Sequence, residues 1–510
     1  MSSPADGWIG DRSNGEVDAV VVGAGPNGLA AAIVLAGAGL EVSVYEAAPT
    51  VGGGTRTAEL TLPGFHHDIC SAAHPMGLAS PFFRAFNLAA HGVRMLRPAV
   101  SYAHPLDGGR AGLAWRDLER TVDGLGQDGP AWRSLLGPLV DRWQGLAGTA
   151  MSDLRSLPPD LVTAARLALR IAEQGSPLWG ARFRGSLAPA LLTGVSAHAI
   201  APPRAPVPAG VGLVLAALGH AVGWPIPRGG SQTIADAMAA ELRRRGGRIV
   251  TGRYIGSLSE LPRASAVLLD LTPAGLLRIA GDTLPGRYAR RMRAYQYGGA
   301  VCKVDFALSG PVPWKASGCE LAGTLHLVGT RDEALAVERE VAAGRHPERP
   351  YVLAVQPGVV DPTRAPVGRH TLYTYAHVPH GSPLDMGEAV TAQLERFAPG
   401  FRDLVLARHV LPAARLAEHN PNYVGGDIAG GTLSPWQTAM RPVPGRDPYA
   451  TPLPGLYLCS ASTPPGPAVH GMCGLYAARQ ALRQRFGILT DPLELVPAPV
   501  AGPLRRKTIE

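Results

Sequence analysis

A run of glycines near the amino end has the spacing of a phosphate-binding turn. The apolar segment Asp18–Val22 is expected to form a strand, and it is followed at once by Gly23-Ala24-Gly25-Pro26-Asn27-Gly28. In such a run the first glycine permits a tight turn, the second lets backbone approach a pyrophosphate, and the third lets the next helix pack on the strand. The N–H groups that begin that helix attract an anion. The spacing therefore predicts a dinucleotide site.

A carboxylate completes this motif. The next expected strand, Glu41–Tyr45, ends at Glu46, which lies 23 residues after Gly23. An acidic side chain at the end of that strand hydrogen-bonds the ribose hydroxyls of a dinucleotide and disfavours a 2′-phosphate. The strand, the helix and the terminal acid are all in place, so a glycine-rich turn without a ligand is the weaker interpretation.

A second glycine cluster predicts FAD rather than a nicotinamide dinucleotide. Within ten residues of Glu46 the chain reads Gly52-Gly53-Gly54-Thr55-Arg56. These glycines let another backbone segment approach the same pyrophosphate, and Arg56 can supply its counter-charge. The sequence has no second glycine motif that directly follows a strand, so no separate NAD(P)H domain is expected. Oxygen, a quinone or a carrier is the expected electron acceptor.

The carboxyl end has the pattern of a further cofactor segment. An expected strand, Gly455–Cys459, leads into a loop rich in proline and glycine and then a helix from about Met472. This order can place Ser460 near the ribityl and phosphate groups. The N–H groups of Gly471 and Met472 would point at the flavin pyrimidine, where reduction builds up negative charge. His470 would hydrogen-bond a flavin carbonyl, face the substrate or serve in packing.

Histidines follow the second glycine cluster. His66, His67 and Asp68 are consecutive, and a chain that has just left the pyrophosphate passes close to the flavin ring or the substrate. Histidine transfers protons at neutral pH, with a carboxylate to orient it. His66 and His67 are therefore candidate proton-transfer groups, and a hydrogen-bonded structural loop is the alternative. No metal site is expected, because no second carboxylate is paired with them.

Several stretches carry a family resemblance. VVVGAGPNGLAAAIVLAGAGLEVSVYEAAPTVGGGTRT resembles the amino-terminal signature of phytoene desaturases, monoamine oxidases and their relatives. PGLYLCSASTPPGPAVHGMCGLYAARQAL resembles the carboxy-terminal FAD segment of the phytoene-dehydrogenase branch. PRGGSQTIADAM, VLLDLTP and AGTLHLVGT are similar to the branch with carotenoid ketolases and the pyridine nucleotide-disulfide oxidoreductase domain-containing protein 2 group. The resemblance extends from about Val17 to Leu482.

This resemblance implies an FAD-dependent oxidoreductase that oxidises, desaturates or isomerises C–C bonds of an apolar, polyene or isoprenoid-like substrate. It also implies that Ile255 touches adenine. Lys303 lies within an apolar strand, where monoamine-oxidase-type relatives carry a lysine that holds a water against flavin N5. The alternative for Lys303 is a strand-edge lysine or one paired with Asp305. The alternative functions are a flavin amine or imine oxidase and a flavin-bearing binding protein without enzymatic activity.

Composition narrows the class of protein. The chain has 510 residues, a net charge of +8 and only 17% charged residues. Its arginines are scattered with no block of like charge, so no nucleic-acid partner is expected. The amino end lacks the pattern of a signal peptide, and the apolar stretch Ala30–Leu40 is too short to span a bilayer. We expect a cytoplasmic monomer or homodimer, with a weak peripheral attraction to anionic membranes.

The expected fold is α/β, with a discontinuous Rossmann-type FAD-binding domain, a β-sheet substrate domain and a helical cap. Residues 17–80, 225–285 and 440–490 are assigned to the FAD-binding domain. Residues 81–224 are assigned to the helical cap and 286–439 to the substrate sheet. Residues 1–16 and 491–510 are expected to be flexible tails.

Overall fold

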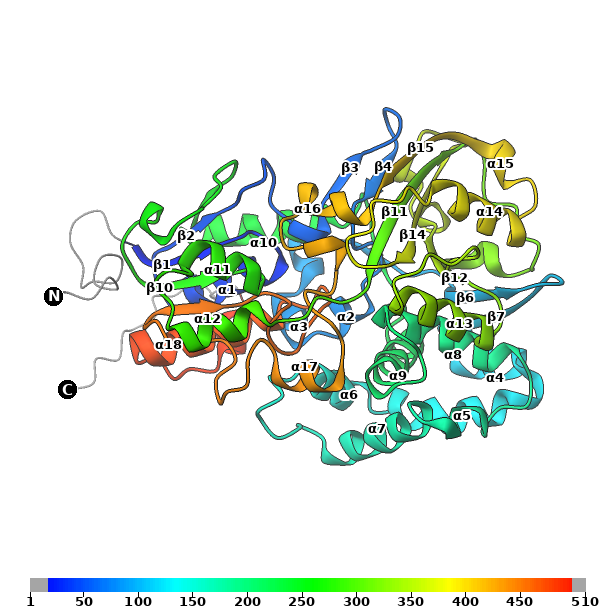
Figure 1. Cartoon of the computed structure of the whole chain (residues 1–510), viewed down its shortest axis with the longest axis horizontal. Coiled ribbons are helices and arrows are strands. Elements are labelled where there is room, and N and C mark those ends of the chain that lie inside the picture. The colour runs from blue at the N-terminus through cyan, green and yellow to red at the C-terminus, as the bar shows by residue number, and fades with distance from the viewer. Residues whose placement is uncertain (1–16, 498–510) are drawn as a thin grey trace.

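Two β-sheets form the framework of the chain (Figure 1), and the computed structural model describes residues 17–497. The predicted tail 1–16, and residues 498–510 of the predicted tail 491–510, lie outside the described residues. The first sheet is entirely parallel and has the strand order β16-β10-β1-β2-β9. Its strands are β1 (Val17–Val22), β2 (Val42–Tyr45), β9 (Arg248–Val250), β10 (Ala264–Leu269) and β16 (Leu456–Leu458).

Strand β1 is apolar because it is buried on both faces. Ala19 and Val21 pack in the same cluster as helices α1 (Pro26–Gly37), α10 (Gln232–Arg244) and α18 (Met472–Phe486). Val20 and Val22 pack in a second cluster with α11 (Pro273–Ala280) and α12 (Gly286–Arg293). Successive side chains of a strand point to opposite faces, so helices cover this sheet on both sides.

Two glycines fix the position of α1. A Cβ added at Gly28 would lie 2.1 Å from the carbonyl oxygen of Gly23, so only glycine lets α1 begin so close to β1. A Cβ at Gly474 of α18 would lie 1.9 Å from the carbonyl oxygen of Asn27. The amino ends of α1 and α18 are therefore held against each other by backbone contact.

The second sheet has seven strands in the order β15-β11-β14-β13-β12-β6-β7. Only β12 and β6 pair in parallel, and every other pair is antiparallel. The strands are β6 (Val100–Leu106), β7 (Arg110–Trp115), β11 (Ala300–Leu308), β12 (Ala322–Leu327), β13 (Val352–Val355), β14 (His370–Val378) and β15 (Val405–Leu411).

This sheet takes in part of the segment that the sequence assigned to the cap. Strands β6 and β7 come from residues 81–224, and β6 is buried along its whole length. Burial on both faces removes the alternation of apolar and polar residues that reveals a strand, and His104 and Pro105 interrupt the apolar run. Strands β6 and β7 therefore belong to the seven-stranded sheet, and the boundaries of the cap stay a prediction.

Helices of the middle segment pack on one side of the seven-stranded sheet, as Figure 1 shows. Helix α8 contacts β6, β7 and β12, α9 lies on α8, and α7 lies on α9. These helices are α4 (Leu118–Gly124), α5 (Gly129–Val140), α6 (Trp143–Ala150), α7 (Leu161–Gln174), α8 (Leu187–Ser196) and α9 (Pro206–Ala221). The opposite face of the sheet packs against α14 (Gly387–Phe397).

The remaining elements are short or peripheral. Two small ladders pair β3 with β4 and β5 with β8. The strands are β3 (Thr57–Glu59), β4 (His66–Asp68), β5 (Met95–Leu96) and β8 (Ile226–Pro227), and the helices are α2 (Pro75–Ala79), α3 (Pro81–Phe86), α13 (Arg331–Ala342), α15 (Phe401–Leu404), α16 (Leu416–His419) and α17 (Pro435–Met440).

The predicted α/β fold, with a Rossmann-type domain, a sheet domain and helices over it, is confirmed. Within the predicted carboxyl-terminal tail, residues 492–495 form a short 3-10 helix, and Arg245 donates hydrogen bonds to the carbonyls of Leu495 and Val496. No helix within residues 17–497 is both long and apolar enough to cross a membrane.

Candidate functional site

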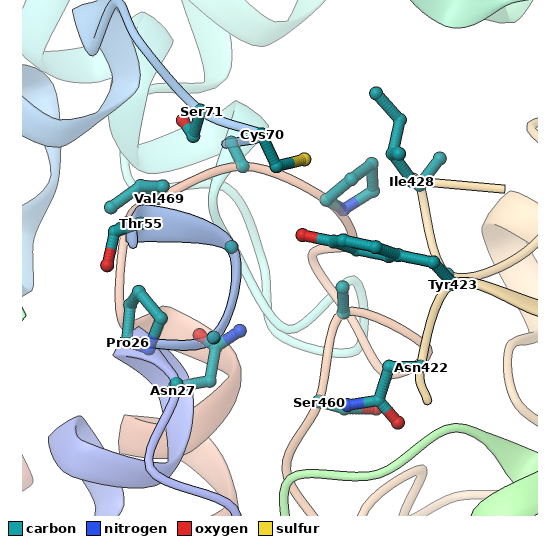
Figure 2. Close-up of a pocket in the computed structure, with 18 of the residues that line it drawn as sticks. Pro26, Asn27, Thr55, Cys70, Ser71, Asn422, Tyr423, Ile428, Ser460 and Val469 are labelled. Carbon is teal, nitrogen blue, oxygen red and sulfur yellow. The ribbon is translucent and has the colours of Figure 1, made fainter. Parts of the chain in front are cut away.

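A cavity of about 1230 Å³ extends from the glycine turns of the first sheet to the face of the second. Figure 2 shows part of its wall, with Asn27 and Thr55 on one side and Tyr423 and Ile428 on the other. Ligand pockets for drug-sized molecules measure roughly 300–1,000 Å³. This cavity is larger, which fits a dinucleotide together with a second molecule.

The first glycine turn forms one end of the cavity. Gly23 has a φ of 99°, which favours glycine, and a Cβ added at Gly25 would lie only 2.7 Å from the Asp270 carboxylate. Helix α1 begins here at Pro26, which has no N–H, and its N-cap residue Gly25 offers no side-chain cap. Asp270 accepts the N–H of Gly28, so Asn27 is the first helical residue whose N–H can meet a ligand. These features fit the phosphates of a bound cofactor.

The second glycine cluster lies against the first, as its sequence predicted. The N–H of Gly52 donates to the carbonyl of Ala24 over 2.8 Å, and a Cβ at Gly53 would lie 3.1 Å from the Cα of Gly25. Arg56 lines the cavity beside them, and its guanidinium donates to the carbonyls of Gly53 and His419. Two backbone segments and one cation therefore surround the same space.

Most of the predicted cofactor residues line this cavity. Glu46 is buried, and its carboxylate accepts the N–H groups of Ala24 and Ala48 over 2.7 and 2.9 Å. The Ser460 hydroxyl donates to the carbonyl of Leu271. The predicted residues in the wall are Gly23, Gly25, Pro26, Asn27, Glu46, Gly53, Gly54, Thr55, Arg56, Ile255 and Ser460.

Four other predicted cofactor residues lie behind the wall. Ala24 and Gly28 support the turn through their backbone. Gly471 and Met472 begin α18, and Gly471 is packed against Phe82, so the cavity wall in this segment is formed by Val469 instead. The predicted contact of Gly471 and Met472 with the flavin stays a prediction.

Lys303 is buried in β11 and paired with Asp305. Its ammonium donates to the Asp305 carboxylate and lies 3.7 Å from the centre of the Tyr373 ring. Burial lowers the pKa of Lys303, and the Asp305 carboxylate opposes that shift. Tyr373 lines the cavity and Lys303 lies behind it. The pairing expected as the alternative is present, and the role of Lys303 at the flavin stays a prediction.

The other three predicted catalytic residues also lie outside the wall. His66 is half-exposed on β4 beside Glu59. His67 is buried next to Thr61 and Asp305, and burial lowers its pKa to about 3. His470 is buried, and its Nδ1 accepts the N–H of Met472 at the start of α18. For these three residues the described contacts are structural, and their proposed parts in proton transfer stay predictions.

Asp270 is a wall residue that the sequence reasoning missed. It follows β10 directly, and its Oδ2 accepts the N–H of Gly28 over 3.0 Å at the start of α1. Burial, with a smaller contribution from nearby Glu46, raises the pKa of Asp270 to about 7. Asp270 could have been found from the sequence because it is a polar residue at the carboxyl end of an apolar strand, where the ligands of parallel sheets bind. The carboxyl group faces the place where a pyrophosphate would bind.

The sequence also did not reveal the residues at the opposite end of the cavity, which faces the seven-stranded sheet. This end carries Thr324, Tyr373 and Tyr375 from the seven-stranded sheet, together with His198 and Trp224. These residues come together because strands distant in the sequence pair with one another, and no local sequence pattern predicts that pairing. Within residues 17–497, no group of three or more His, Cys, Asp or Glu side chains is arranged to hold a metal ion.

Comparison with known proteins agrees with this geometry. Residues 21–87 match the NAD(P)-binding Rossmann-like domain family. The chain is 28% identical to mouse pyridine nucleotide-disulfide oxidoreductase domain-containing protein 2, over 94% of this chain and 97% of the mouse protein. This is a group that the sequence resemblance named. The phytoene-desaturase branch stays a prediction.

Solved structures show the same fold. An oxidoreductase from Methanosarcina mazei has a TM-score of 0.57 at 18% identity, covering 91% of this chain and all of the other. Cyclohexylamine oxidase from Brevibacterium oxydans has a TM-score of 0.55 at 16% identity, covering 91% and 98%. The chain has the fold of a flavin-dependent oxidoreductase. These comparisons agree with the predicted cofactor, FAD.

The Gly25→Val variant should lose FAD. A valine side chain would occupy the space between the glycine turn and Asp270 that the pyrophosphate needs, so the purified variant should be colourless while the parent is yellow. Flavin absorbance per mole of folded protein measures this. Gly137→Ala in α5 is the control, since a Cβ there meets only ordinary contacts. Full flavin occupancy in Gly25→Val would contradict this location of the phosphates.

FAD affinity should fall as pH rises above about 7. Asp270 has a raised pKa, so it is neutral below that value, and above it the ionised carboxylate repels the pyrophosphate. One linked proton gives at most about a tenfold loss of affinity per pH unit. Asp270→Asn keeps an acceptor for the Gly28 N–H without the charge, so its affinity should stay nearly constant.

FAD titration of apoprotein between about pH 6 and 9 measures this dependence. Asp236→Asn, which alters an exposed carboxylate of α10, is the control and should behave like the parent. A parent whose FAD affinity does not change across that range would show that Asp270 does not face the phosphates.

Proposed function

We propose that this chain is an FAD-dependent oxidoreductase that oxidises, desaturates or isomerises C–C bonds of a neutral, largely apolar substrate. FAD would be held at the glycine-turn end of the cavity, where the chain offers the amino end of helix α1, Arg56 and Glu46. When bound, this cofactor supplies hydride acceptance at its ring. The substrate class follows from the chemistry of the remaining wall.

The charges of the cavity wall are unevenly distributed. Its three carboxylates are Glu46, Asp270 and Glu418. Glu46 and Asp270 accept N–H groups of the first glycine turn, and Glu418 precedes His419, whose carbonyl accepts from Arg56. All three therefore belong to the cofactor end. No carboxylate among the described residues lines the sheet end, where a cationic substrate would need one.

Apolar side chains dominate that sheet end. They come from the cap helices α7 and α9 on one side and from strands β13 and β14 on the other. This half of the wall is formed by Leu167, Ile171, Ile200, Val211, Val214, Leu215, Trp224, Leu353, Val355, Tyr373 and Tyr375. Such a surface excludes water and binds hydrocarbon, which is the single observation that carries the substrate class.

Lys303 also opposes an ammonium substrate. Its charge lies against the ring of Tyr373, so the aromatic face that would attract a cation already has one. The amine-oxidase alternative is favoured by Tyr373 and Tyr375 as cavity aromatics and by the shared fold with cyclohexylamine oxidase. The missing carboxylate and the adjacent lysine favour the neutral substrate over that alternative.

Exposed apolar side chains lie on the loop before α7, on α7 and on α17, three segments that also contribute residues to the cavity wall. Leu154 lines the cavity and is partly exposed, while Leu157, Leu161, Leu169 and Trp436 are 64–85% exposed. Arg155 donates to the carbonyl of Ala439 and so ties the loop before α7 to α17. These side chains support entry of an apolar substrate from a lipid phase and the expected peripheral contact with membranes.

Fractionated cell extract tests the substrate class. An organic extract is washed with dilute acid, which removes amines, and both phases are added anaerobically to the holoprotein. The neutral organic phase should bleach the flavin or yield an altered compound by mass spectrometry, and the acid phase should do neither. Activity that follows the acid phase would establish the amine-oxidase alternative, and activity in neither phase would contradict the proposal.

Lys303→Met should slow reoxidation of the photoreduced flavin by oxygen about tenfold. A nearby cation stabilises the negative charge that develops on oxygen, and a loss of ~1.4 kcal/mol corresponds to a factor of ten. Stopped-flow absorbance measures the rate without knowledge of the substrate.

The single variant leaves the buried Asp305 carboxylate without its partner. The Lys303→Met/Asp305→Asn double variant removes that carboxylate as well and is therefore the control. It should reoxidise as slowly as the single variant, because the cation is lost in both. Parent-like rates in both variants would make Lys303 a member of a structural ion pair only.

A further inference from the structure

The sheet end of the cavity is mainly apolar, and two polar side chains of its wall, those of Thr324 and His198, each have a polar atom that makes no hydrogen bond within residues 17–497. Thr324 lies on β12, lines the cavity and is 1% exposed, and its hydroxyl has no hydrogen-bond partner. His198 lies between α8 and α9 and lines the same cavity. An unpaired buried hydroxyl is costly, and Thr324 differs from Thr371, the other such threonine of the sheet that pairs with no group, in lining the cavity, where a polar atom of a ligand can pair with it.

His198 is joined to a second histidine behind the wall. Its Nε2 lies 2.9 Å from Nε2 of His326, which is fully buried on β12 two residues after Thr324. Residues two apart on a strand point to the same face, so Thr324 and His326 lie on the face that meets the cavity. The ring of Trp224 packs edge-on against His198, with 5.3 Å between ring centres.

The surroundings of His326 fix the proton positions in this pair. Nδ1 of His326 is buried without a partner. An unpaired N–H is worse tolerated in a protein interior than an unpaired acceptor, so we assign the proton of His326 to Nε2. That N–H donates to Nε2 of His198. His198 is neutral because burial lowers its pKa to about 3, so its own proton is on Nδ1.

His198 therefore presents a hydrogen-bond donor to the cavity. No hydrogen bond within residues 17–497 reaches this Nδ1. The hydroxyl of Thr324, which lies on β12 two residues before His326, has no partner either and can donate as well. Two donors in an otherwise apolar wall match one oxygen atom with two lone pairs. An ammonium offers only donors and would leave both groups unpaired.

We propose that His198 and Thr324 recognise a carbonyl or hydroxyl oxygen of an otherwise hydrocarbon substrate, with His326 as the positioning residue that holds the His198 tautomer. This inference rests on the proposed function for the location of the substrate, and it narrows the substrate to an oxygen-bearing apolar molecule. His198 and Thr324 are named the oxygen site.

Two probes with the same carbon skeleton test the oxygen site. Limonene and carvone differ chiefly by the ketone oxygen of carvone, and calorimetry on the holoprotein gives the affinity of each. His198→Phe keeps an aromatic ring but removes the donor. It should therefore lower the affinity for carvone about tenfold and change the affinity for limonene by less than about twofold. Thr324→Val should act in the same direction.

The positioning role of His326 has its own readout. His326→Gln retains an N–H that can donate to His198, so carvone affinity should stay within about threefold of the parent. His326→Leu removes that donor and should lose carvone affinity as His198→Phe does. Thr371→Val is the matched control, because Thr371 is a buried threonine of the same sheet with an unpaired hydroxyl and lies outside the cavity wall.

The outcomes separate this inference from the proposed function. If the parent holoprotein retains FAD but binds no carvone, the oxygen site alone is overturned. The same holds if His198→Phe and Thr324→Val each lose as much affinity for limonene as for carvone. A parent that retains no FAD overturns the proposed function. Equal behaviour of His326→Gln and His326→Leu would remove the positioning role from His326.

Discussion

The structure depends on the amino end of helix α1, whose N-cap residue, Gly25, offers no side-chain cap. Its first N–H groups have no side-chain acceptor from their own helix, and the glycine turn before it leaves space for an anion. Unpaired N–H groups at a helix end are unfavourable unless water, a side chain or a ligand accepts them. Asp270 accepts the one from Gly28, and burial raises the pKa of its carboxyl group to about 7, although this hydrogen bond lowers it. A bound diphosphate would satisfy this helix end more completely.

The rest of the chain is arranged around that helix end. Gly28 and Gly474 let α1 pack by backbone contact on β1 and α18, which holds the turn rigidly at one end of the cavity. The seven-stranded sheet and the helices α7 and α9 complete the other end with apolar side chains. A polar, charged cofactor end thus continues into an apolar end, which would protect the proposed hydride transfer from water.

The cofactor end was predictable from sequence because it is encoded locally. Gly23 to Gly28, Glu46 and Gly53 to Arg56 lie within one strand-helix-strand unit, and fixed spacing in such a unit gives a fixed position in space. Asp270 was missed because its significance depends on β10 pairing with β1, more than 240 residues away in sequence. The same reason applies to His198 and Thr324, which meet only when the cap packs on the sheet.

The histidines show the limit of reasoning from residue type. His66, His67 and His470 were chosen because histidine transfers protons and because they lie near glycine segments in sequence. In the structure each has protein partners outside the cavity wall, whereas His198, which sequence reasoning did not select, lines the cavity. Burial and partners decide what a histidine can do, and neither is visible in the spacing of residues.

Native mass spectrometry of the purified parent chain tests the central claim most directly, since it identifies the ligand held at the α1 helix end without any assay of activity. The account predicts one FAD per chain, released intact when the protein is denatured. A chain that carries a nicotinamide dinucleotide instead, or that takes up no FAD when the cofactor is supplied in excess, would contradict it.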